Sequence, residues 1–563
     1  MSSNTSPQAD GRNLATRPWL RLYAEDMPPE LSLELHSPLE CFERCVALRP
    51  HAHALWYFDS PMSYQEIDAQ AARLAAHWAP TIAVGDRIVI LNQNTPATLV
   101  AIIAAWRLGA IVMPLSPMLT RWELLHHLRD GEPRAALVGA LQAGAFRDAL
   151  LDWGASVSVV SLQLADHLQP TDRPEFLKVL AAPQELSSEW QAFSSLQKQA
   201  PAPKVDLQSS DIAFLTYTSG TTGKPKAAKN THGNVAFSAE VYRRWLRLDA
   251  EDVLFAAAPF SHVTGLVAHI ATAWAAQVPV VMCYRFDPAT VLSLLQRRRC
   301  TSMVAAITAY VALLDHPRFD PSKLHAFTKL FSGGAPVSAA IVDRWEKATG
   351  VYIHNAYGLT ETTSPTHLVP LGARAPVDSL SGVLSVGVPV PATECRIVDS
   401  ETLEEMPQGD EVGELLVRGP QVVGGYWRNQ AETEVAFRNQ WLRTGDLGRT
   451  DPAGWFYIVD RAKDVIVASG FKVWPREVEL VLEAHHAIKE AAVVGIPDAY
   501  RGQAPKAFIV LEPDALLSEQ EILAFCRDRL APYKIPRSVE FVASLPRNHA
   551  GKLLRRALRV EDK

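Results

Sequence analysis

The sequence predicts an α/β protein with a large N-terminal domain of wound sheets and helices and a small, mobile α+β C-terminal domain. Two observations support this fold class. Between residues 62 and 138, short apolar segments alternate with amphipathic ones, which is typical of a parallel sheet with covering helices. In addition, 563 residues, 48% of them hydrophobic, are too many for one compact core.

The alternation of helices and strands can be assigned in order. Ser63-Tyr-Gln-Glu66 has the pattern of a capping box, and the amphipathic stretch after it predicts a helix to Trp78. The following segments predict strands at 87–91, 111–115 and 135–138 and helices at 95–108 and near 121–129. Residues 166–210, rich in Pro, Gln, Ser and Asp, predict a surface connection.

One apolar run, residues 263–283, is long enough to be considered as a membrane-spanning helix. Residues 263–283 contain no Asp, Glu, Lys or Arg, but Pro279 divides them into an Ala-rich half and a short Val-Val-Met segment. This pattern favours a buried helix followed by a buried strand over a membrane span. Peripheral attachment through a hydrophobic substrate stays open.

The chain changes character around Asp460-Arg-Ala-Lys-Asp464, where short strands and two amphipathic helices, near 475–487 and 518–530, begin. We therefore expect domains at 1–460 and 461–563. A polar, charged hinge at 461–464 could rotate without disrupting apolar packing.

Composition limits the partners and the location. A net charge of -6 gives no electrostatic reason to expect nucleic acid. Six scattered cysteines and a polar start at Met1–Pro18 predict a reduced, cytoplasmic protein without a signal peptide.

A polar loop is the most informative motif. Tyr217-Thr-Ser-Gly-Thr-Thr-Gly-Lys-Pro-Lys226 follows an apolar strand at 212–216 and combines hydroxyls, glycines and lysines. Backbone N–H groups, hydroxyls and ammonium groups in such a loop can donate to phosphate oxygens. It is not a Walker loop, because only two residues separate its glycines and Pro225 stands where Mg²⁺ would need a hydroxyl. A flexible linker is the alternative.

Three further segments have the composition of ligand-binding loops. In His354-Asn-Ala-Tyr-Gly-Leu-Thr-Glu361, Tyr357 offers a ring face for a purine, Thr360 a hydroxyl and Glu361 a hard oxygen for Mg²⁺. The paired glycines of Phe331-Ser-Gly-Gly-Ala-Pro336 suit a wall of a binding site where the backbone contacts the ligand. The same pair of glycines is also typical of an ordinary tight turn. In the third, 258–265, His262 lies among apolar residues, where a histidine is more often a core residue than a catalyst.

Single charged residues complete the set. Asp446 follows Trp441 in an expected turn, and an ionised carboxylate can accept both hydroxyls of a ribose. Its alternative is a surface ion pair with an arginine such as Arg461. Lys552 precedes an expected amphipathic helix in a basic tail.

These motifs, in this order from 217 to 556, closely resemble the adenylate-forming enzymes, which include acyl-CoA synthetases, firefly luciferases and peptide-synthetase adenylation domains. The resemblance implies that Lys552, Thr360 and Glu361 are catalytic, with Glu361 on Mg²⁺, and that Tyr357 stacks on adenine. It implies that Asp446 and Arg461 hold the ribose, that Lys463 is the hinge, and that the Gly470-Phe471 turn faces the pantetheine of CoA.

The remaining residues are also assigned by the resemblance. ATP and CoA would be bound by Thr218, Ser219, Gly220, Thr221, Thr222, Gly223, Lys226, Gly334, Ala335, Pro336, Asn355, Ala356, Tyr357, Gly358, Asp446, Ile458, Arg461, Lys463, Ser469, Gly470 and Phe471. The acid would be bound by His262, Val263, Gly265, Gly333 and Gly334, with Trp245 as a further pocket residue.

Three positions depart from the family pattern. Ala227 stands where a glycine is usual, Thr308-Ala309 replaces a Val-Pro-Pro-like turn, and Val467 stands where some relatives carry a lysine active in thioester formation. The departure at Thr308-Ala309 concerns the local shape of the acyl pocket.

The resemblance implies an ATP-dependent acid–CoA ligase using Mg²⁺, which forms an acyl-adenylate from a medium- or long-chain fatty acid or an arylalkanoic acid and passes the acyl group to CoA. One alternative transfers the acyl group to a carrier protein, another is a non-catalytic nucleotide sensor, and an oxygenase like luciferase has no distinguishing feature here. Either a monomer or a homodimer is compatible with the sequence.

Overall fold

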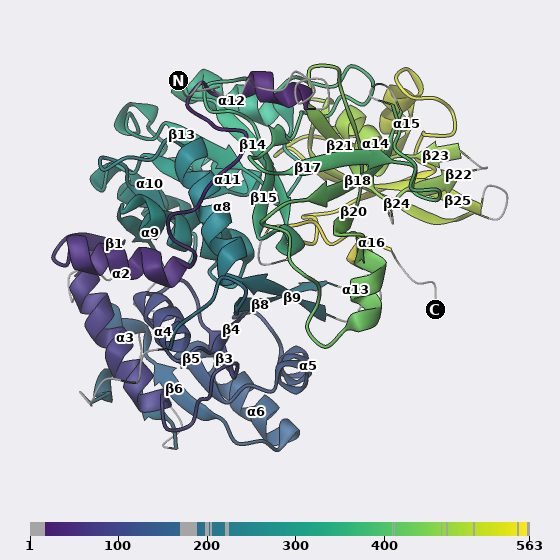
Figure 1. Ribbon diagram of the computed structural model, residues 1–563. Coiled ribbons are helices and arrows are strands. Elements are labelled where there is room, and N and C mark those ends of the chain that lie inside the picture. Colours follow the sequence, from purple (N-terminus) through teal and green to yellow (C-terminus); the bar gives the residue numbers. More distant parts are fainter. Residues whose placement is uncertain are drawn as a thin grey trace, which may run out of the picture.

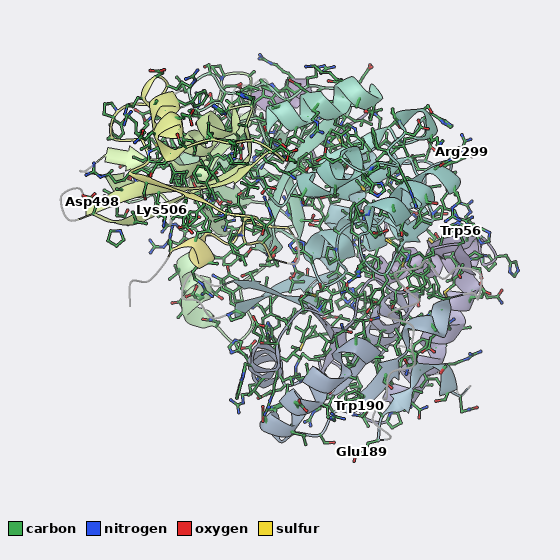
Figure 2. The ribbon with its side chains drawn as sticks, turned by 180° about the vertical axis from the view of Figure 1, so that it is seen from behind. Trp56, Glu189, Trp190, Arg299, Asp498 and Lys506 are labelled. Carbon is green, nitrogen blue, oxygen red and sulfur yellow. The ribbon has the colours of Figure 1, made fainter. Side chains whose placement is uncertain are left out.

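The computed structural model describes residues 17–168, 189–197, 202, 205–219, 225–407, 409, 411–462, 464–468, 471–498, 502–548 and 551–559. Within these residues the strands form four sheets, three in the large N-terminal part and one in the smaller C-terminal domain (Figure 1). Figure 2 labels residues from three parts of the molecule: Trp56 in the nine-stranded sheet, Trp190 next to the seven-stranded sheet, and Lys506 on the small domain.

The seven-stranded sheet confirms the predicted alternation. Its order is β7-β6-β5-β3-β4-β8-β9, in which β3 to β6 are parallel and β8 pairs with β9 antiparallel. The strands are β3 (Arg87–Leu91), β4 (Ile111–Leu115), β5 (Ala135–Gly139), β6 (Ser158–Leu162), β7 (Gln191–Ala192), β8 (Ile212–Ser219) and β9 (Pro225–Thr231).

Local signals in the sequence explain where the first helices begin. Ser63 accepts from the Glu66 N–H while the Glu66 carboxylate accepts from the Ser63 N–H, so α3 starts where the capping box predicts. Pro96 is the first residue of α4, where its missing N–H costs nothing. The helices of this region are α2 (Pro38–Leu48), α3 (Tyr64–Trp78), α4 (Pro96–Arg107), α5 (Arg121–Gly131) and α6 (Ala143–Trp153).

The nine-stranded sheet contains or adjoins three of the predicted ligand-binding segments, 258–265, 331–336 and 354–361. Its order is β16-β15-β14-β13-β12-β10-β11-β1-β2, with β10 to β14 parallel and β14–β15 antiparallel. Its strands are β1 (His53–Tyr57), β2 (Ser60–Ser63), β10 (Leu254–Phe255), β11 (Val280–Met282), β12 (Ser302–Ala305), β13 (Lys329–Ser332), β14 (Ile353–Leu359), β15 (Ser364–Leu368) and β16 (Val388–Pro389). Around it lie α8 (His232–Trp245), α9 (Thr272–Ala276), α10 (Pro288–Arg297), α11 (Ile307–Leu314) and α12 (Ala339–Thr349).

The apolar run at 263–283 is a buried helical segment followed by a buried strand, as predicted. It begins with a π-helical stretch, Gly265–Ala271, continues as α9 and ends in β11. Among the residues described, no helix combines the length and apolarity that crossing a bilayer requires.

A five-stranded sheet lies between this region and the small domain. It consists of β17 (Glu394–Val398), β18 (Gly413–Arg418), β19 (Phe437–Arg438), β20 (Trp441–Thr450) and β21 (Phe456–Arg461), with α13 (Gln430–Ala436) beside it. The small domain has its own sheet and its own apolar core, formed only by residues after 465. It contains β22 (Ile466–Ala468), β23 (Phe471–Val473), β24 (Ile488–Asp498), β25 (Gly502–Leu511), β26 (Ser538–Phe541), α14 (Pro475–Glu483), α15 (Glu519–Arg527) and α16 (Arg555–Leu558).

Candidate active site

The predicted phosphate loop begins at the end of β8 and finishes at the start of β9, two strands that pair antiparallel. β8 extends through Thr218 and Ser219, and Thr218 lies opposite Lys226 of β9. The Thr218 hydroxyl is buried and has no hydrogen-bond partner among the described residues. A buried, unpaired hydroxyl at this point fits a donor reserved for a ligand. Four predicted residues, Gly220, Thr221, Thr222 and Gly223, and the side chain of Ser219 lie outside the described residues.

Lys226 lies at the β9 end of this loop. Its ammonium lies 3.0 Å from a Glu432 carboxylate oxygen and 4.0 Å from the centre of the Tyr426 ring. Lys226 is thus directed toward α13 by an ion pair and a cation–π contact.

The predicted nucleotide segment is mostly strand, which corrects the expected loop. Asn355, Ala356, Tyr357 and Gly358 belong to β14, and the turn is Thr360–Thr362, one turn of 3₁₀ helix before β15. The strand was not recognised because its pairing partner, β15, comes only after the turn. Gly358 is required here, because a Cβ would lie 1.5 Å from the Ser364 carbonyl oxygen.

The turn between β14 and β15 is strained. Thr363 and Ser364 both have positive φ, 48° and 90°. The Asn230 amide donates to the Thr360 carbonyl at 3.0 Å and to the Thr363 hydroxyl at 2.8 Å, and the Tyr242 hydroxyl lies 2.9 Å from that of Ser364. Strain held in place by surrounding bonds is common at ligand sites.

The two residues assigned to the ribose lie next to each other, together with Tyr357. The Asp446 carboxylate, 2% exposed, accepts a hydrogen bond of 2.6 Å from the Tyr357 hydroxyl and pairs with Arg461 Nε at 2.9 Å. Burial, together with the nearby Asp446 carboxylate, raises the pKa of Tyr357. A carboxylate has about four acceptor positions, so Asp446 retains capacity for a ribose diol. Asp446 and Arg461 are opposite each other in the β20–β21 pairing, and Asp446 therefore lies in a strand and not in the expected turn. Ile458 lies in the same strand as Arg461.

The two glycines expected at the acid pocket serve different purposes. A Cβ on Gly333 would lie 2.7 Å from the Ala356 carbonyl oxygen, so Gly333 allows β13 and β14 to approach closely. Gly334 has φ +79° and open space where a Cβ would be, and it precedes Ala335 and the exposed Pro336. The Gly333 N–H donates to Ala305, which connects this wall to the end of β12.

The His262 segment is a tight turn before the π-helical stretch. His262 Nδ1 accepts a hydrogen bond from the Thr264 N–H at 3.3 Å, and this bond orients the imidazole ring. Gly265 allows the turn to fold onto Pro259, since a Cβ would lie 2.2 Å from its carbonyl oxygen, and Val263 is buried. Trp245 is buried in the core and donates to the Val369 carbonyl at 3.0 Å.

Lys552 lies in a turn that contacts the large part of the chain. The Lys552 N–H donates to the Asn548 side chain at 2.9 Å, and Gly551 has φ +80°. A Cβ on Gly551 would lie 3.2 Å from the Thr308 hydroxyl and 3.7 Å from Ala306 Cβ. Ala306 follows Ala305, whose carbonyl accepts from Gly333, so the Lys552 turn lies next to the wall that carries the acid candidates.

The expected CoA face is described only in part. β22 and β23 form the predicted antiparallel hairpin, but Lys463, Ser469, Gly470 and the side chain of Phe471 lie outside the described residues. Val467 is half exposed, and its N–H donates to Gln503 at 2.9 Å.

Glu361 has a neighbour that sequence reasoning missed. The Tyr426 hydroxyl donates to Glu361 Oε1 at 2.8 Å, and the Val423 N–H donates to the Glu361 carbonyl at 2.9 Å. Asn230 was missed as well. Neither Tyr426 nor Asn230 lies in a recognisable motif, because each forms its hydrogen bonds with a segment more than 60 residues away in the sequence.

The nucleotide residues also fit a magnesium ion. In the described part of the chain no group of three or more His, Cys, Asp or Glu side chains could hold a metal by itself. A single carboxylate such as Glu361, with one oxygen bound by Tyr426, matches the way Mg²⁺ is bound through one or two carboxylates, phosphates and water.

Comparisons with known proteins show the family of the chain. Residues 42–427 match the family described as AMP-binding enzyme, and residues 477–552 match the AMP-binding enzyme C-terminal domain. The chain is 33% identical over 569 residues to a long-chain-fatty-acid–CoA ligase of Bacillus subtilis, covering 97% of this chain and 98% of the relative. It is 32% identical over 517 residues to a feruloyl-CoA synthase of an Amycolatopsis species, covering 92% and 97%.

A solved structure gives the same result. The ATP-bound structure of MatB from Rhodopseudomonas palustris superposes with a TM-score of 0.79 at 30% identity, over 92% of this chain and 98% of that one. The protein belongs to the family of AMP-binding, adenylate-forming enzymes.

Proposed function

We propose that the protein is an AMP-forming acid–CoA ligase that activates a medium- or long-chain fatty acid or an arylalkanoic acid. Its substrates are ATP, the acid and CoA, and it uses Mg²⁺. The relatives support the class of reaction, since one is named for long-chain fatty acids and another for a feruloyl group.

One observation supports the assignment of residues. The small domain holds the Lys552 turn against Ala306 and Thr308, beside the wall that contains Gly333, while the large part holds the carboxylates of Asp446 and Glu361. No side-chain nucleophile is needed for this chemistry, because both substrates arrive with their reactive groups.

In the first half-reaction, a carboxylate oxygen of the acid attacks the α-phosphorus of ATP, and the bond to the pyrophosphate oxygen breaks. The Tyr357–Asp446–Arg461 group positions the ribose, and the Thr218 and Thr360 hydroxyls donate to phosphate oxygens. Lys552 lies between two anions whose approach would otherwise be unfavourable in a low dielectric. Bound at Glu361, Mg²⁺ would neutralise charge on the phosphates.

In the second half-reaction, the CoA thiol attacks the acyl carbon, the bond to AMP oxygen breaks, and the thiol proton leaves to solvent. Rotation of the small domain about Lys463, at a domain boundary near residue 461, would remove Lys552 and bring in the Gly470-Phe471 turn. The polar junction supports this movement, since Asp460 contacts the small domain through the Arg476 N–H at 3.0 Å.

A cytoplasmic location and a monomeric or homodimeric state belong to the same proposal. All six cysteines carry free thiols, which supports a reducing environment. The carrier-protein alternative has no support from the relatives, which are named as CoA ligases over nearly the whole chain.

The test is a pyrophosphate-release screen with ATP and Mg²⁺ over fatty acids of graded length, benzoate and phenylalkanoates, followed by CoA-dependent thioester formation without carrier protein. We expect release with at least one acid class and thioester formation on addition of CoA. No release across the panel would contradict the substrate class, and release without a CoA thioester would contradict the acceptor.

A further inference from the structure

Tyr426 connects the two phosphate-facing parts of the site. It lies in a short segment, Gly425–Trp427, that runs along the edge of β9: the Lys229 N–H donates to Gly425, and the Trp427 N–H donates to Ala227. The side chain is 4% exposed and packs with Ala228 and Val423. Its hydroxyl is directed away from this apolar cluster to Glu361 Oε1, at 2.8 Å.

The position of Tyr426 is fixed from several sides. Its N–H donates to the Thr433 hydroxyl at 3.0 Å, and Gly425 beside it has φ +128° with Thr433 Cγ2 only 2.5 Å from where a Cβ would be. The Lys226 ammonium lies 4.0 Å above its ring, and Glu432 pairs with that ammonium at 3.0 Å. The phenol therefore has little freedom to turn away from Glu361.

Glu361, in contrast, has little other support for its carboxylate. Its backbone is held by the Val423 N–H, but among the described residues the structure records no hydrogen-bond donor to its carboxylate except Tyr426. Without this donor, the carboxylate could rotate about its side-chain torsions. Groups that orient a metal-binding carboxylate commonly change metal affinity without touching the metal.

We propose that Tyr426 is a positioning residue: its hydroxyl holds one Glu361 oxygen so that the other is presented to Mg²⁺ bound with the ATP phosphates. Lys226 and Glu432 hold the phenol in place, which links the β9 end of the phosphate loop to the metal-binding carboxylate. This inference rests on the proposed function, in which Glu361 binds Mg²⁺.

The test measures ATP binding without the acid, so that no reaction takes place. ATP affinity is determined by calorimetry in excess Mg²⁺ and again in excess EDTA, and the ratio of the two affinities reports the contribution of Mg²⁺. Tyr426→Phe removes only the hydroxyl. We expect the ratio to fall about tenfold, the lower end of the usual effect of a residue that supports a metal ligand, while ATP affinity in EDTA stays unchanged.

Matched variants separate the alternatives. Tyr457→Phe removes a phenol that also donates to a carboxylate, Asp451, at 2.8 Å in a turn of the β20–β21 pair, and should leave the ratio unchanged. Glu361→Gln should reduce the ratio toward one.

An unchanged ratio in Tyr426→Phe would overturn the inference. If both affinities fall equally, so that the ratio stays the same, Tyr426 is a packing residue. If the unmodified protein shows no effect of Mg²⁺, or Glu361→Gln leaves the ratio intact, the metal-binding role of Glu361 in the proposed function fails, and the inference fails with it.

Discussion

The segment that carries Glu361 and the segments around Lys552 are supported in different ways. Around Glu361, the support is backbone packing: Gly358 touches the Ser364 carbonyl, Gly333 touches that of Ala356, and Asn230 binds the turn from the side. Around Lys552, charged contacts accompany a small apolar cluster that includes Leu545, Leu553 and Leu558. On one side of Lys552 in the sequence, Arg547 pairs with Glu490 at 2.6 Å. On the other side, Arg555 pairs with Glu479.

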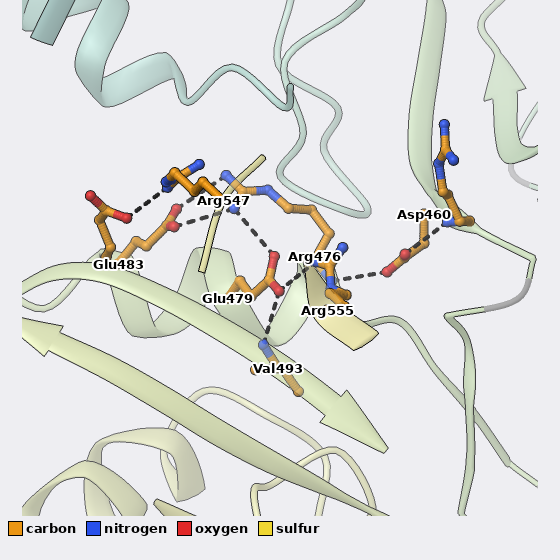
Figure 3. A network of polar contacts seen from close by, with 9 residues as sticks. Asp460, Arg476, Glu479, Glu483, Val493, Arg547 and Arg555 are labelled. Atoms are coloured by element: carbon orange, nitrogen blue, oxygen red, sulfur yellow. Dashed lines mark hydrogen bonds and ion pairs between the residues drawn. The ribbon is translucent and has the colours of Figure 1, made fainter. Parts of the chain in front are cut away.

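Figure 3 shows how far this ionic network extends. Glu479, 2% exposed, pairs with Arg476 and Arg555 and accepts from the Val493 N–H at 3.0 Å, and Arg476 also pairs with Glu483 at 3.1 Å. The large part reaches it through Asp460 at the end of β21. Contacts of this kind can break and form again without opening an apolar core, which a rotating domain requires.

The largest effect on activity is expected from a substitution of Lys552. Lys552→Ala should lower pyrophosphate release with acid and ATP by about 10²–10³-fold, the usual effect of removing one preorganised group that stabilises transition-state charge. Thioester formation from supplied acyl-adenylate should change little. Lys506→Ala, at the outer edge of the small domain, is the matched control, since the Lys506 ammonium pairs with the exposed residue Glu540 at 2.8 Å and lies over the Phe508 ring. Equal loss in both half-reactions would refute the assignment of Lys552.

The packing side of the comparison is tested at Gly358. Gly358→Ala places a methyl group against the Ser364 backbone, and we expect a loss of about 3 kcal/mol or more in unfolding free energy. Gly144→Ala, in α6 with open space around the new Cβ, should instead gain about 0.5–1 kcal/mol. Urea unfolding monitored by fluorescence measures both, and similar stabilities for the two variants would show that the hairpin tolerates a side chain.

The charged side is tested at Glu479. Glu479→Gln leaves Arg476 and Arg555 buried without their shared carboxylate, and we expect a loss of about 3 kcal/mol in the small domain. Hydrogen exchange of β24 and β25 should increase while that of β14 stays the same. Faster exchange in β14 as well would mean that the two regions unfold together.

Many of the helices and strands could be predicted from the sequence. The features that were not predicted depend on contacts between distant parts of the chain. Ser63, Pro96 and Ser518 set the starts of their helices through local bonds, so α3, α4 and α15 were placed within a few residues. The hydrogen bond between Tyr357 and Asp446 was not predicted. The family resemblance assigned both residues to the nucleotide, but they are 89 residues apart and no local pattern joins them.

What could not be predicted depends on pairing between distant segments. Tyr357 and Asp446 were expected in loops because the partner strands that make them part of β14 and β20 come later in the chain. Tyr426 was missed because a tyrosine after two glycines has no local sign of its bond to Glu361.

A smaller effect concerns pH, and it should have opposite signs in the two regions. Burial lowers the pKa of His269 and His367 to about 3 and of His232 and His354 to about 4, and all four lie in the large part. Their neutral state contributes stability above the unfolded pKa of about 6.5, and this is lost as pH falls. At pH 5.5 each should cost the large part about 1.4 kcal/mol.

At the junction, burial raises the pKa of Asp460 to about 6. A raised pKa means that the contribution of Asp460 to folding stability is fully present below its unfolded pKa of 3.8 and is lost as pH rises through 6. Hydrogen exchange at pH 7.5 and 5.5, corrected for intrinsic rates, should show less protection in β14 at the lower pH. Asp460→Asn should remove the pH dependence of protection at the Arg476 N–H. The same sign of change in both regions would contradict this prediction.

The most direct test locks the two lobes together. Ala306 Cβ lies 3.7 Å from the position of a Cβ on Gly551, close to the ~3.8 Å typical of disulfides. The variant Ala306→Cys with Gly551→Cys, once oxidised, should release one equivalent of pyrophosphate and retain the acyl-adenylate, and should form thioester with CoA only after reduction. If the oxidised protein forms thioester at the rate of the reduced one, the small domain does not move between the two half-reactions and the account is wrong.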